Sequence, residues 1–308
     1  MHIPFLGTIV KTTFKSSVQM VNYFTSKRIF EAIEKDNIQI IRDYINQNGN
    51  LDIVWNEDFT CNALNVGTDT LLNYAIYKDR FEIFKLLVDS GADINSKHNF
   101  ETPLGYTVSL DRRPYFEYLV SKHAILDERG RETGLGNGCT PLIEAVCKNR
   151  FDYVKRLIEL GANPVRTNRD RVIPIYYTRE KDISPDIFKY LLDHMSDYQI
   201  NMHFQNRVFT VLILITFYGA HNHRYVIEML DYLLKRNVEL DKLNRHGASA
   251  LYCAEETLYS SNNRGKNEFY IAQEKIVERL KAVGAKSYFK GKLRNVKPFY
   301  LYKTDSFA

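Results

Sequence analysis

Apolar residues in this chain are grouped into short segments that recur at a nearly constant spacing. Three pairs of segments are clear: 70–75 with 86–95, 102–104 with 118–124, and 140–145 with 156–164. Weaker copies follow at Ile173, Thr210 and Ser249, which gives spacings of 32, 38, 33, 37 and 39 residues from Thr70 onwards. A period of this length predicts a repeat architecture, with insertions where the spacing is longer.

The residue types at the segment borders predict where each helix begins and ends. Thr at the start of each first segment can accept backbone N–H bonds as a helix cap, and Pro in the next position has no N–H that would need a partner. Gly91 and Gly161, within second segments, and Gly284 in the last copy supply the left-handed residue that ends a helix. His123 and Asn237 replace that glycine in two copies and mark irregular repeats.

These segments resemble the ankyrin repeat, whose signature is T-P-L-H-x-A followed by a second helix that ends L-L-x-x-G-A-D-x-N. The resemblance implies an all-α ankyrin-repeat solenoid of about six helix-turn-helix repeats that begin near residues 67, 99, 137, 170, 207 and 246. Residues 28–50 resemble a degenerate capping helix pair, so the expected solenoid spans 28–286. An N-terminal extension, 1–27, precedes it, and a basic aromatic tail, 287–308, follows it.

The most apolar run, 208–219, has 12 residues, whereas a membrane-spanning helix needs about 20. It predicts a buried helix.

The first residues carry no basic segment and no small-residue cleavage pattern, so no secretory signal peptide is expected. The four cysteines are scattered, which favours reduced thiols in a cytoplasmic compartment.

Composition excludes a disordered chain, since 44% of the 308 residues are hydrophobic. The net charge is only +5, but residues 264–303 hold 11 Lys and Arg against 3 Glu. Three interpretations of the tail stay open. It can cap the last repeat, contact an acidic protein or a membrane surface, or bind nucleic acid through phosphates and stacking.

No group of residues organises an active site, so we expect neither an enzyme nor a cofactor. The glycines at 134–138 precede a repeat entry rather than follow a strand, which fits a long finger and not a dinucleotide site. His221 and His223 have no third ligand at metal-binding spacing, and Cys139 and Cys147 have no His–Asp pair to activate them. The alternative is an enzyme whose cryptic site is formed by irregular repeats and the tail.

Ankyrin repeats, by resemblance, bind other proteins through finger tips and the concave face of the first helices. That resemblance places the partner-binding residues at Tyr77, Lys78, His98, Asn99, Glu101, Arg169, Asp170, Arg207, Phe217, Tyr218 and Arg245. Further positions on the same surfaces are Ser109, Leu110, Cys147, Lys148, Glu180, Lys181, Asn206, Phe209 and His246. Asn95 lies in a segment that resembles the site of asparaginyl hydroxylation, and its ordinary role is that of a turn residue.

A composition rich in Ile, Asn, Lys and Tyr fits an AT-rich genome. Divergent repeats with insertions resemble the ankyrin proteins that intracellular bacteria or large viruses place in host cells. The leading hypothesis is therefore a host-directed effector or adaptor that binds a partner protein in the cytoplasm. A basic module for nucleic acid or lipid is the further alternative.

Overall fold

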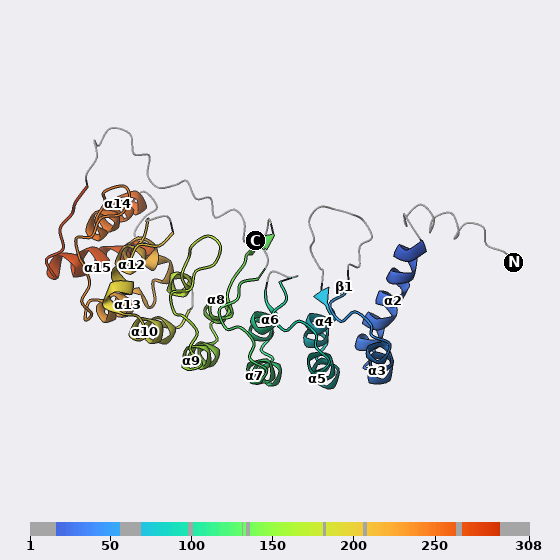
Figure 1. Cartoon of the computed structure of the whole chain (residues 1–308). Helices are drawn as coiled ribbons and strands as arrows, with labels where there is room; N and C mark the ends of the chain where they lie inside the picture. Colours follow the sequence, from blue (N-terminus) through green and yellow to red (C-terminus); the bar gives the residue numbers. More distant parts are fainter. Residues whose placement is uncertain are drawn as a thin grey trace. The chain divides into compact units, whose positions relative to one another are not determined.

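The computed structural model describes residues 17–55, 69–97, 101–130, 132–133, 136–180, 183–205, 208–262 and 267–289. The chain divides into two compact units, Met1–Pro141 and Leu142–Ala308. Each unit is built of short helix pairs in which a first helix packs on a second one (Figure 1). Strands are confined to two-residue pieces in the described residues.

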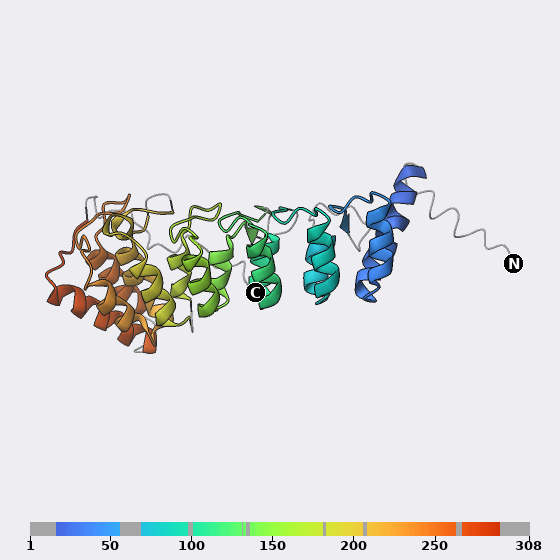
Figure 2. The same cartoon turned by 60° about the horizontal axis from the view of Figure 1, so that its bottom comes forward.

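In unit 1, three helix pairs stand side by side. They are α2 (Ser17–Glu34) with α3 (Ile38–Asn46), α4 (Leu71–Tyr77) with α5 (Phe81–Asp89), and α6 (Pro103–Ser109) with α7 (Arg113–Ser121). The first helices α2, α4 and α6 form one layer, and the second helices form the layer beneath it (Figures 1 and 2). Helix α2 begins at Ser17, earlier than the expected start of the cap at Arg28.

Unit 1 contains two antiparallel strand pairs, one between its first and second helix pairs and one after its third. Strand β1 (Val54–Trp55) pairs with β2 (Asp69–Thr70), with Val54 opposite Thr70. Strand β3 (Glu132–Thr133) pairs with β4 (Gly136–Asn137). These hairpins are the fingers that connect successive repeats.

The expected helix caps are present. Thr70 accepts the N–H of Asn73 at 3.2 Å, and Thr102 accepts the N–H of Gly105 at 3.2 Å. Thr210 and Ser249 cap the later repeats in the same way. Gly91, Gly161 and Gly284 end second helices with φ values of +94°, +98° and +81°.

Unit 2 continues the helix pairs with more irregular elements. They are α8 (Pro141–Cys147), α9 (Phe151–Glu159), the 3-10 helix η1 (Pro174–Arg179), α10 (Pro185–Asp193), α11 (Asp197–Asn201), α12 (Val211–Tyr218), the 3-10 helix η2 (Gly219–Asn222), α13 (Val226–Leu233), α14 (Ala250–Asn262) and α15 (Glu268–Ala282). The fourth repeat therefore has a 3-10 turn where an α-helix was expected, because Ile173 replaces the capping Thr and has no side-chain oxygen to accept a backbone N–H.

The two residues that replace a helix-ending glycine behave differently. His123 adopts the left-handed conformation, with φ of +62°. Asn237 does not have a positive φ, although Asn tolerates a left-handed conformation better than His does. The chain after α13 turns before it reaches Asn237, because the Arg236 N–H donates to the Leu233 carbonyl. Asn237 therefore occupies the glycine's place in the sequence without adopting its left-handed conformation.

Helix α12 is the buried helix that the run 208–219 predicts. Residues 211–216 are all buried, and α12 lies against α13 and α14. Gln273 of α15 is fully buried beside it, and its amide donates to the carbonyls of Thr216 and Ala254 at 2.9 and 3.0 Å. One side chain thus ties together three helices of unit 2.

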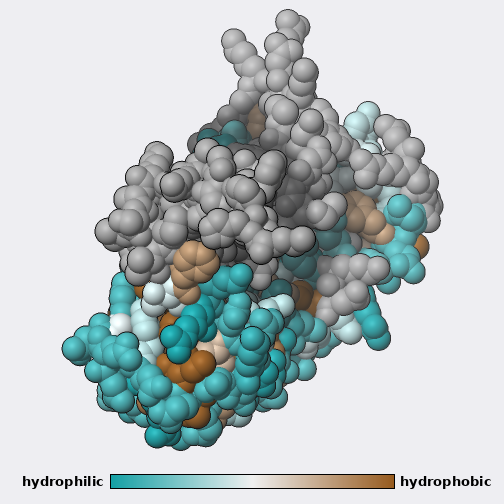
Figure 3. Space-filling view, turned by 90° about the vertical axis from the view of Figure 1, so that its right-hand side faces the viewer, coloured by the Kyte–Doolittle hydropathy of each residue, from teal (hydrophilic) through white to brown (hydrophobic). Residues whose placement is uncertain are grey.

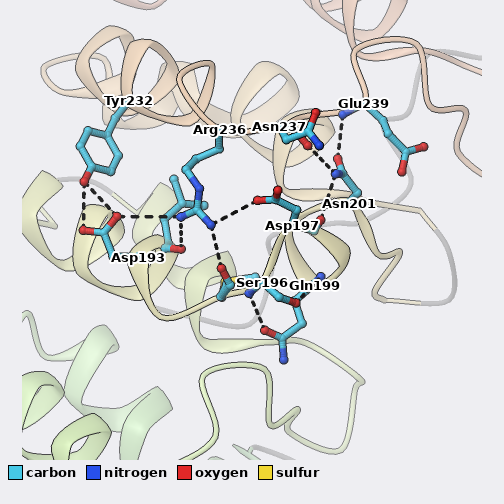
Figure 4. Close-up of polar contacts among 11 residues, drawn as sticks. Asp193, Ser196, Asp197, Gln199, Asn201, Tyr232, Arg236, Asn237 and Glu239 are labelled. Atoms are coloured by element: carbon cyan, nitrogen blue, oxygen red, sulfur yellow. Dashed lines mark hydrogen bonds and ion pairs between the residues drawn. The ribbon is translucent and has the colours of Figure 1, made fainter.

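The insertion after α10 is held by a polar network (Figure 4). The Arg236 guanidinium donates to the carbonyls of Leu192 and Met195 at 2.8 and 2.9 Å and pairs with Asp197 at 3.3 Å. Asn201 donates to the carbonyls of Asp197 and Asn237 and accepts the N–H of Glu239. A capping box of Ser196 and Gln199 begins α11. The network satisfies the free carbonyls at the end of α10.

The start of the tail packs on the last repeat. Ser249 and Tyr288 exchange two hydrogen bonds, from the Ser249 N–H to the Tyr288 carbonyl at 2.9 Å and from the Tyr288 N–H to the Ser249 hydroxyl at 3.0 Å. The Phe289 ring stacks on Tyr252 with centroids 4.8 Å apart. Residues 286–289 therefore act as a cap, and tail residues 290–308 lie outside the described part of the chain.

Candidate protein-interaction surface

The C-terminal ends of the first helices in unit 1 form a row. Because a Thr caps both α4 and α6, the same positions of each helix face the same side, and Tyr77 and Lys78 correspond to Ser109 and Leu110. Helix α4 lies between α2 and α6. The row therefore runs from Glu34 at the end of α2 through Tyr77 and Lys78 to Ser109.

An ion pair lies at the centre of this row. The Lys78 ammonium is 2.9 Å from a Glu34 carboxylate oxygen. Hydrogen bonding and charge from Lys78 hold the pKa of Glu34 below its usual value, and the hydrogen bond that Lys78 donates to Glu34 raises the pKa of Lys78. Both groups are charged at neutral pH, and the pair fixes the position of the lysine.

Aromatic rings surround that lysine. Its ammonium lies 5.3 Å from the centroid of the Tyr74 ring and 5.4 Å from that of Tyr77, within the range of a cation–π contact. Tyr74 packs edge-on against Phe30 of α2 at 5.1 Å. Tyr77 is 51% exposed. We call Glu34, Tyr74, Tyr77 and Lys78 the tyrosine patch.

The tyrosine patch has the chemistry of an interface anchor. Tyrosine offers a large apolar ring and a hydroxyl, and such residues carry much of the binding energy at protein interfaces. The end of unit 1 formed by α2 and α3 is mainly hydrophilic, with hydrophobic areas between the hydrophilic ones (Figure 3). An exposed ring held in place by neighbours loses little entropy on binding.

The other expected positions in unit 1 are less accessible. Ser109, Leu110 and Glu101 are half-buried. Asn95 donates its N–H to the Asp93 carboxylate at 2.9 Å within the turn, and its side-chain oxygen accepts the N–H of Ile125, 30 residues further along, at 2.8 Å. His98 and Asn99 lie outside the described residues.

In unit 2, Arg169, Asp170 and Arg245 are exposed on fingers, as are Cys147, Lys148 and Glu180 at helix ends. Arg245 donates from Nε to Nε2 of His246 at 2.8 Å. Burial and then the neighbouring Arg245 lower the pKa of His246, so the imidazole is neutral at pH 7. Asn206, Arg207 and Lys181 lie outside the described residues, and of Tyr218 only the backbone, at the end of α12, is described.

Phe209 is not on an exposed finger, contrary to expectation. It is 5% exposed, and its ring lies about 6 Å from those of Tyr176, Phe204 and Phe217. An isolated antiparallel β-bridge between Phe204 and Phe209 turns the Phe209 side chain inward. Phe217 is half-buried against it and is a weaker candidate for an interface anchor than Tyr77.

Sequence reasoning missed the residues that shape the fingers. Buried Asn168 accepts the N–H of Val172 at 2.9 Å and donates to the Tyr177 hydroxyl at 3.0 Å. Asn244 accepts the N–H groups of His246 and Ala248 at 2.9 and 3.0 Å. The recurring pair Asn-Arg at 168–169 and 244–245 was the available signal.

The cysteines and histidines whose chemistry could serve catalysis or metal binding lie in surroundings that give them a structural role. Cys147 has an exposed surface, yet desolvation of its sulfur, followed by the carboxylates of Glu144 and Glu180, raises the pKa of the thiol. Burial raises the pKa of Cys253 to about 12. The His221 ring packs on Phe269 at 5.3 Å, and His223 pairs with Glu268 at 2.6 Å. Within the described ranges, no three His, Cys, Asp or Glu residues gather as metal ligands.

Comparisons with known proteins agree with the repeat pattern. Residues 72–168 match the family model for ankyrin repeats in three copies. An ankyrin repeat protein of variola virus is 30% identical over 196 residues, which cover 60% of this chain and 32% of that protein. A putative ankyrin repeat protein of fowlpox virus is 29% identical over 46% of this chain and 41% of its own length, and one of a mimivirus is 29% identical over 43% of each.

Helix pairs, finger hairpins and capped first helices define an all-α helical-repeat protein. With the comparisons, residues 72–168 carry ankyrin repeats, and the chain is similar to ankyrin-repeat proteins of viruses. It spans about a third of the variola relative and about two fifths of the fowlpox one. No helix among the described residues is long and apolar enough to cross a bilayer.

Proposed function

We propose that this chain is a protein-binding module and that the tyrosine patch of unit 1 is its principal contact surface. Ankyrin repeats generally mediate contacts between proteins, and the observation that carries the proposal is the half-exposed Tyr77 beside the Lys78–Glu34 ion pair. Tyrosine held in this way is typical of interface anchors. In unit 2, taken by itself, the exposed finger residues Arg169, Asp170 and Arg245 are further proposed contact residues.

The biological role that we propose is a host-directed adaptor in the cytoplasm of an infected cell. The viral relatives support it, since poxvirus and mimivirus proteins share the repeats. No catalytic step is part of the proposal. The raised thiol pKa of Cys147 and Cys253 disfavours the alternative of a cysteine-based enzyme, because the thiolate is the nucleophile.

The test is affinity capture from eukaryotic cell lysate with the intact chain and the Tyr77→Ala variant, with captured proteins quantified by mass spectrometry. Loss of a central anchor costs about 2 kcal/mol, equivalent to about 30-fold in affinity, so a specific partner should disappear from the variant. Tyr198→Ala is the matched control, because Tyr198 is 81% exposed on α11 of unit 2. A partner captured equally by the intact chain and Tyr77→Ala would exclude the tyrosine patch as the anchor.

A further inference from the structure

The second helices of unit 1 end in turns that are closed by two residues. After α5 these residues are Gly91 and Ala92. After α3 they are Asn48 and Gly49, and Asn48 has φ of +56°, in the left-handed region that Asn tolerates better than most residues. The Gly49 N–H donates to the Tyr44 carbonyl at 3.0 Å, and Ala92 forms the corresponding bond at 3.1 Å. The two turns share their geometry and differ in their chemistry.

The ring of Tyr44 explains why glycine replaces alanine after α3. A Cβ at position 49 would lie 2.4 Å from Cζ of that ring, so any other residue would have to displace it. The Tyr44 hydroxyl donates to the Asn50 carbonyl at 2.9 Å, which holds the ring over the turn. Burial raises the pKa of Tyr44, so its hydroxyl stays protonated and donates at neutral pH. The pair Asn48-Gly49 therefore follows from two requirements, a left-handed residue and a residue without Cβ.

Asparagine followed by glycine has a reactivity of its own. Glycine has no side chain to hinder its nitrogen, so that nitrogen can attack the preceding side-chain amide. At this pair the bond between the Gly49 nitrogen and Cγ of Asn48 forms, the Cγ–Nδ2 bond breaks, and ammonia leaves with the proton of the Gly49 N–H. Water then opens the succinimide ring at one of its two carbonyls. The product is aspartate or isoaspartate, and isoaspartate adds one carbon atom to the main chain.

The folded turn opposes this reaction. The attack needs the Gly49 nitrogen to give up its proton and to approach Cγ of Asn48. In the folded chain that N–H is bonded to the Tyr44 carbonyl, and the Tyr44 ring lies against the half-buried Gly49. Asn48 itself is exposed, so water reaches the site once the turn opens. Helix ends are among the segments that open locally at low free-energy cost.

We infer that Asn48 is a site of spontaneous deamidation and that opening of the turn after α3 sets its rate. The longer main chain of isoaspartate moves Gly49 away from Tyr44, so the bonds that close the turn are lost. The same segment leads to Asp52, whose carboxylate accepts the Asp93 N–H at 2.9 Å in the turn after α5. Deamidation therefore loosens α3 and its connection to the next repeat without a route back. The inference is independent of the proposed function.

The experiment incubates the full chain at pH 7.4 and 37 °C, either folded or unfolded in guanidinium chloride. Peptide mass spectrometry follows deamidation, and electron-transfer fragmentation separates isoaspartate from aspartate. The second Asn-Gly pair of the sequence, Asn137-Gly138, is the reference in the unfolded chain, where both pairs should react at similar rates. Asn48 should react at least about tenfold more slowly in the folded chain than in the unfolded one, because the turn must open first.

Three variants separate the turn from the rest of the chain. Tyr44→Phe keeps the ring but loses the bond to the Asn50 carbonyl, so deamidation of Asn48 in the folded chain should be about threefold faster. Tyr198→Phe removes an exposed hydroxyl of unit 2 and should leave that rate unchanged. Asn48→Gly suits the left-handed position and removes the amide. After incubation it should keep its hydrogen exchange in α3, whereas the unchanged chain should exchange faster there.

Three results would overturn the inference. Equal rates for Asn48 in the folded and unfolded chains would mean that the turn exerts no control. An unfolded chain in which Asn137 reacts and Asn48 does not would mean that the site is absent. Equal acceleration by Tyr44→Phe and Tyr198→Phe would mean that general unfolding, and not the turn after α3, sets the rate.

Discussion

Left-handed backbone positions in this protein follow a rule that is visible residue by residue. Gly91, Gly161 and Gly284 end second helices, whereas Asp36, Asp79, Asp111 and Asn149 end first helices with φ between +54° and +59°. Asp and Asn are the side-chain-bearing residues that tolerate this conformation best. The glycines were recognised from the sequence, and the Asp and Asn positions were not, although Asp-Arg or Asn-Arg recurs after three first helices.

Arg171→Gly should stabilise the protein. The substitution relieves a left-handed side chain, which costs about 1–2 kcal/mol, but it also makes the unfolded chain more flexible, so we expect a net gain of about 0.5–1 kcal/mol. Urea unfolding followed by circular dichroism measures it. Gly247 holds the same place in the turn that begins at Asn244, with φ of +73°, so Gly247→Arg should destabilise by a similar or larger amount. A loss of stability in Arg171→Gly would show that contacts of the arginine outweigh the strain.

The thiol of Cys147 should react slowly despite its exposed surface. Because desolvation and the carboxylates of Glu144 and Glu180 raise its pKa, the reactive thiolate is scarce at pH 7.5 and increases as the pH is raised beyond 9. Iodoacetamide labelling in a Cys61→Ser, Cys139→Ser background, followed by peptide mass spectrometry, gives the rate against pH. Glu144→Gln should speed the reaction at pH 7.5, and a plateau already at pH 8 would contradict this explanation.

At the scale of elements, the irregular repeats of unit 2 replace standard caps with long polar side chains. The Arg236 side chain, in the loop after α13, donates hydrogen bonds to carbonyls at the end of α10. The Gln273 amide of α15 donates to one carbonyl of α12 and one of α14. These partners lie 19 to 57 residues apart in the chain. Such contacts compensate for a 3-10 turn in the fourth repeat and for an insertion before the fifth.

Arg236→Met should destabilise unit 2 by about 2 kcal/mol. Methionine keeps the aliphatic stem, but the carbonyls of Leu192 and Met195 lose charge-assisted donors and Asp197 loses its ion pair. Thermal and urea unfolding measure the change. Lys242→Met is the control, because its ammonium pairs only with the exposed Glu239 among the contacts described for it, and such pairs contribute under about 1 kcal/mol. Similar losses in both variants would exclude the capping role.

At the scale of the whole molecule, stability in a repeat protein is approximately a sum of local interfaces. The chain divides into two compact units, and most of the helix contacts join helices within a repeat or in adjacent repeats. The effect of a substitution should therefore remain near its own repeat.

Hydrogen exchange of Arg236→Met tests this locality. Amides of α10, α11 and α13 should exchange faster, whereas those of α4–α7 in unit 1 should keep the rates of the unchanged chain. Peptide-level mass spectrometry resolves the two regions. Faster exchange throughout both units would mean that the chain unfolds as one cooperative body, which a sum of local interfaces does not allow.

The sequence by itself determined the repeat, its period and the caps, because these depend on contacts between residues three or four apart. Thr70, Thr102, Gly91 and Gly161 act locally, so the pattern alone located them. It also indicated Tyr77 and Arg169 as exposed candidates, since their places in the repeat follow from the period.

Tertiary structure alone decided the burial of Phe209, the conformation at Asn237 and the pairing of Tyr288 with Ser249. It also decided that Lys78 meets Glu34, 44 residues away, and that Arg171 closes a turn where its counterpart is a glycine. These outcomes depend on which distant segments lie against one another. Insertions shift those segments without changing the local signature, and for that reason the sequence pattern could not report them.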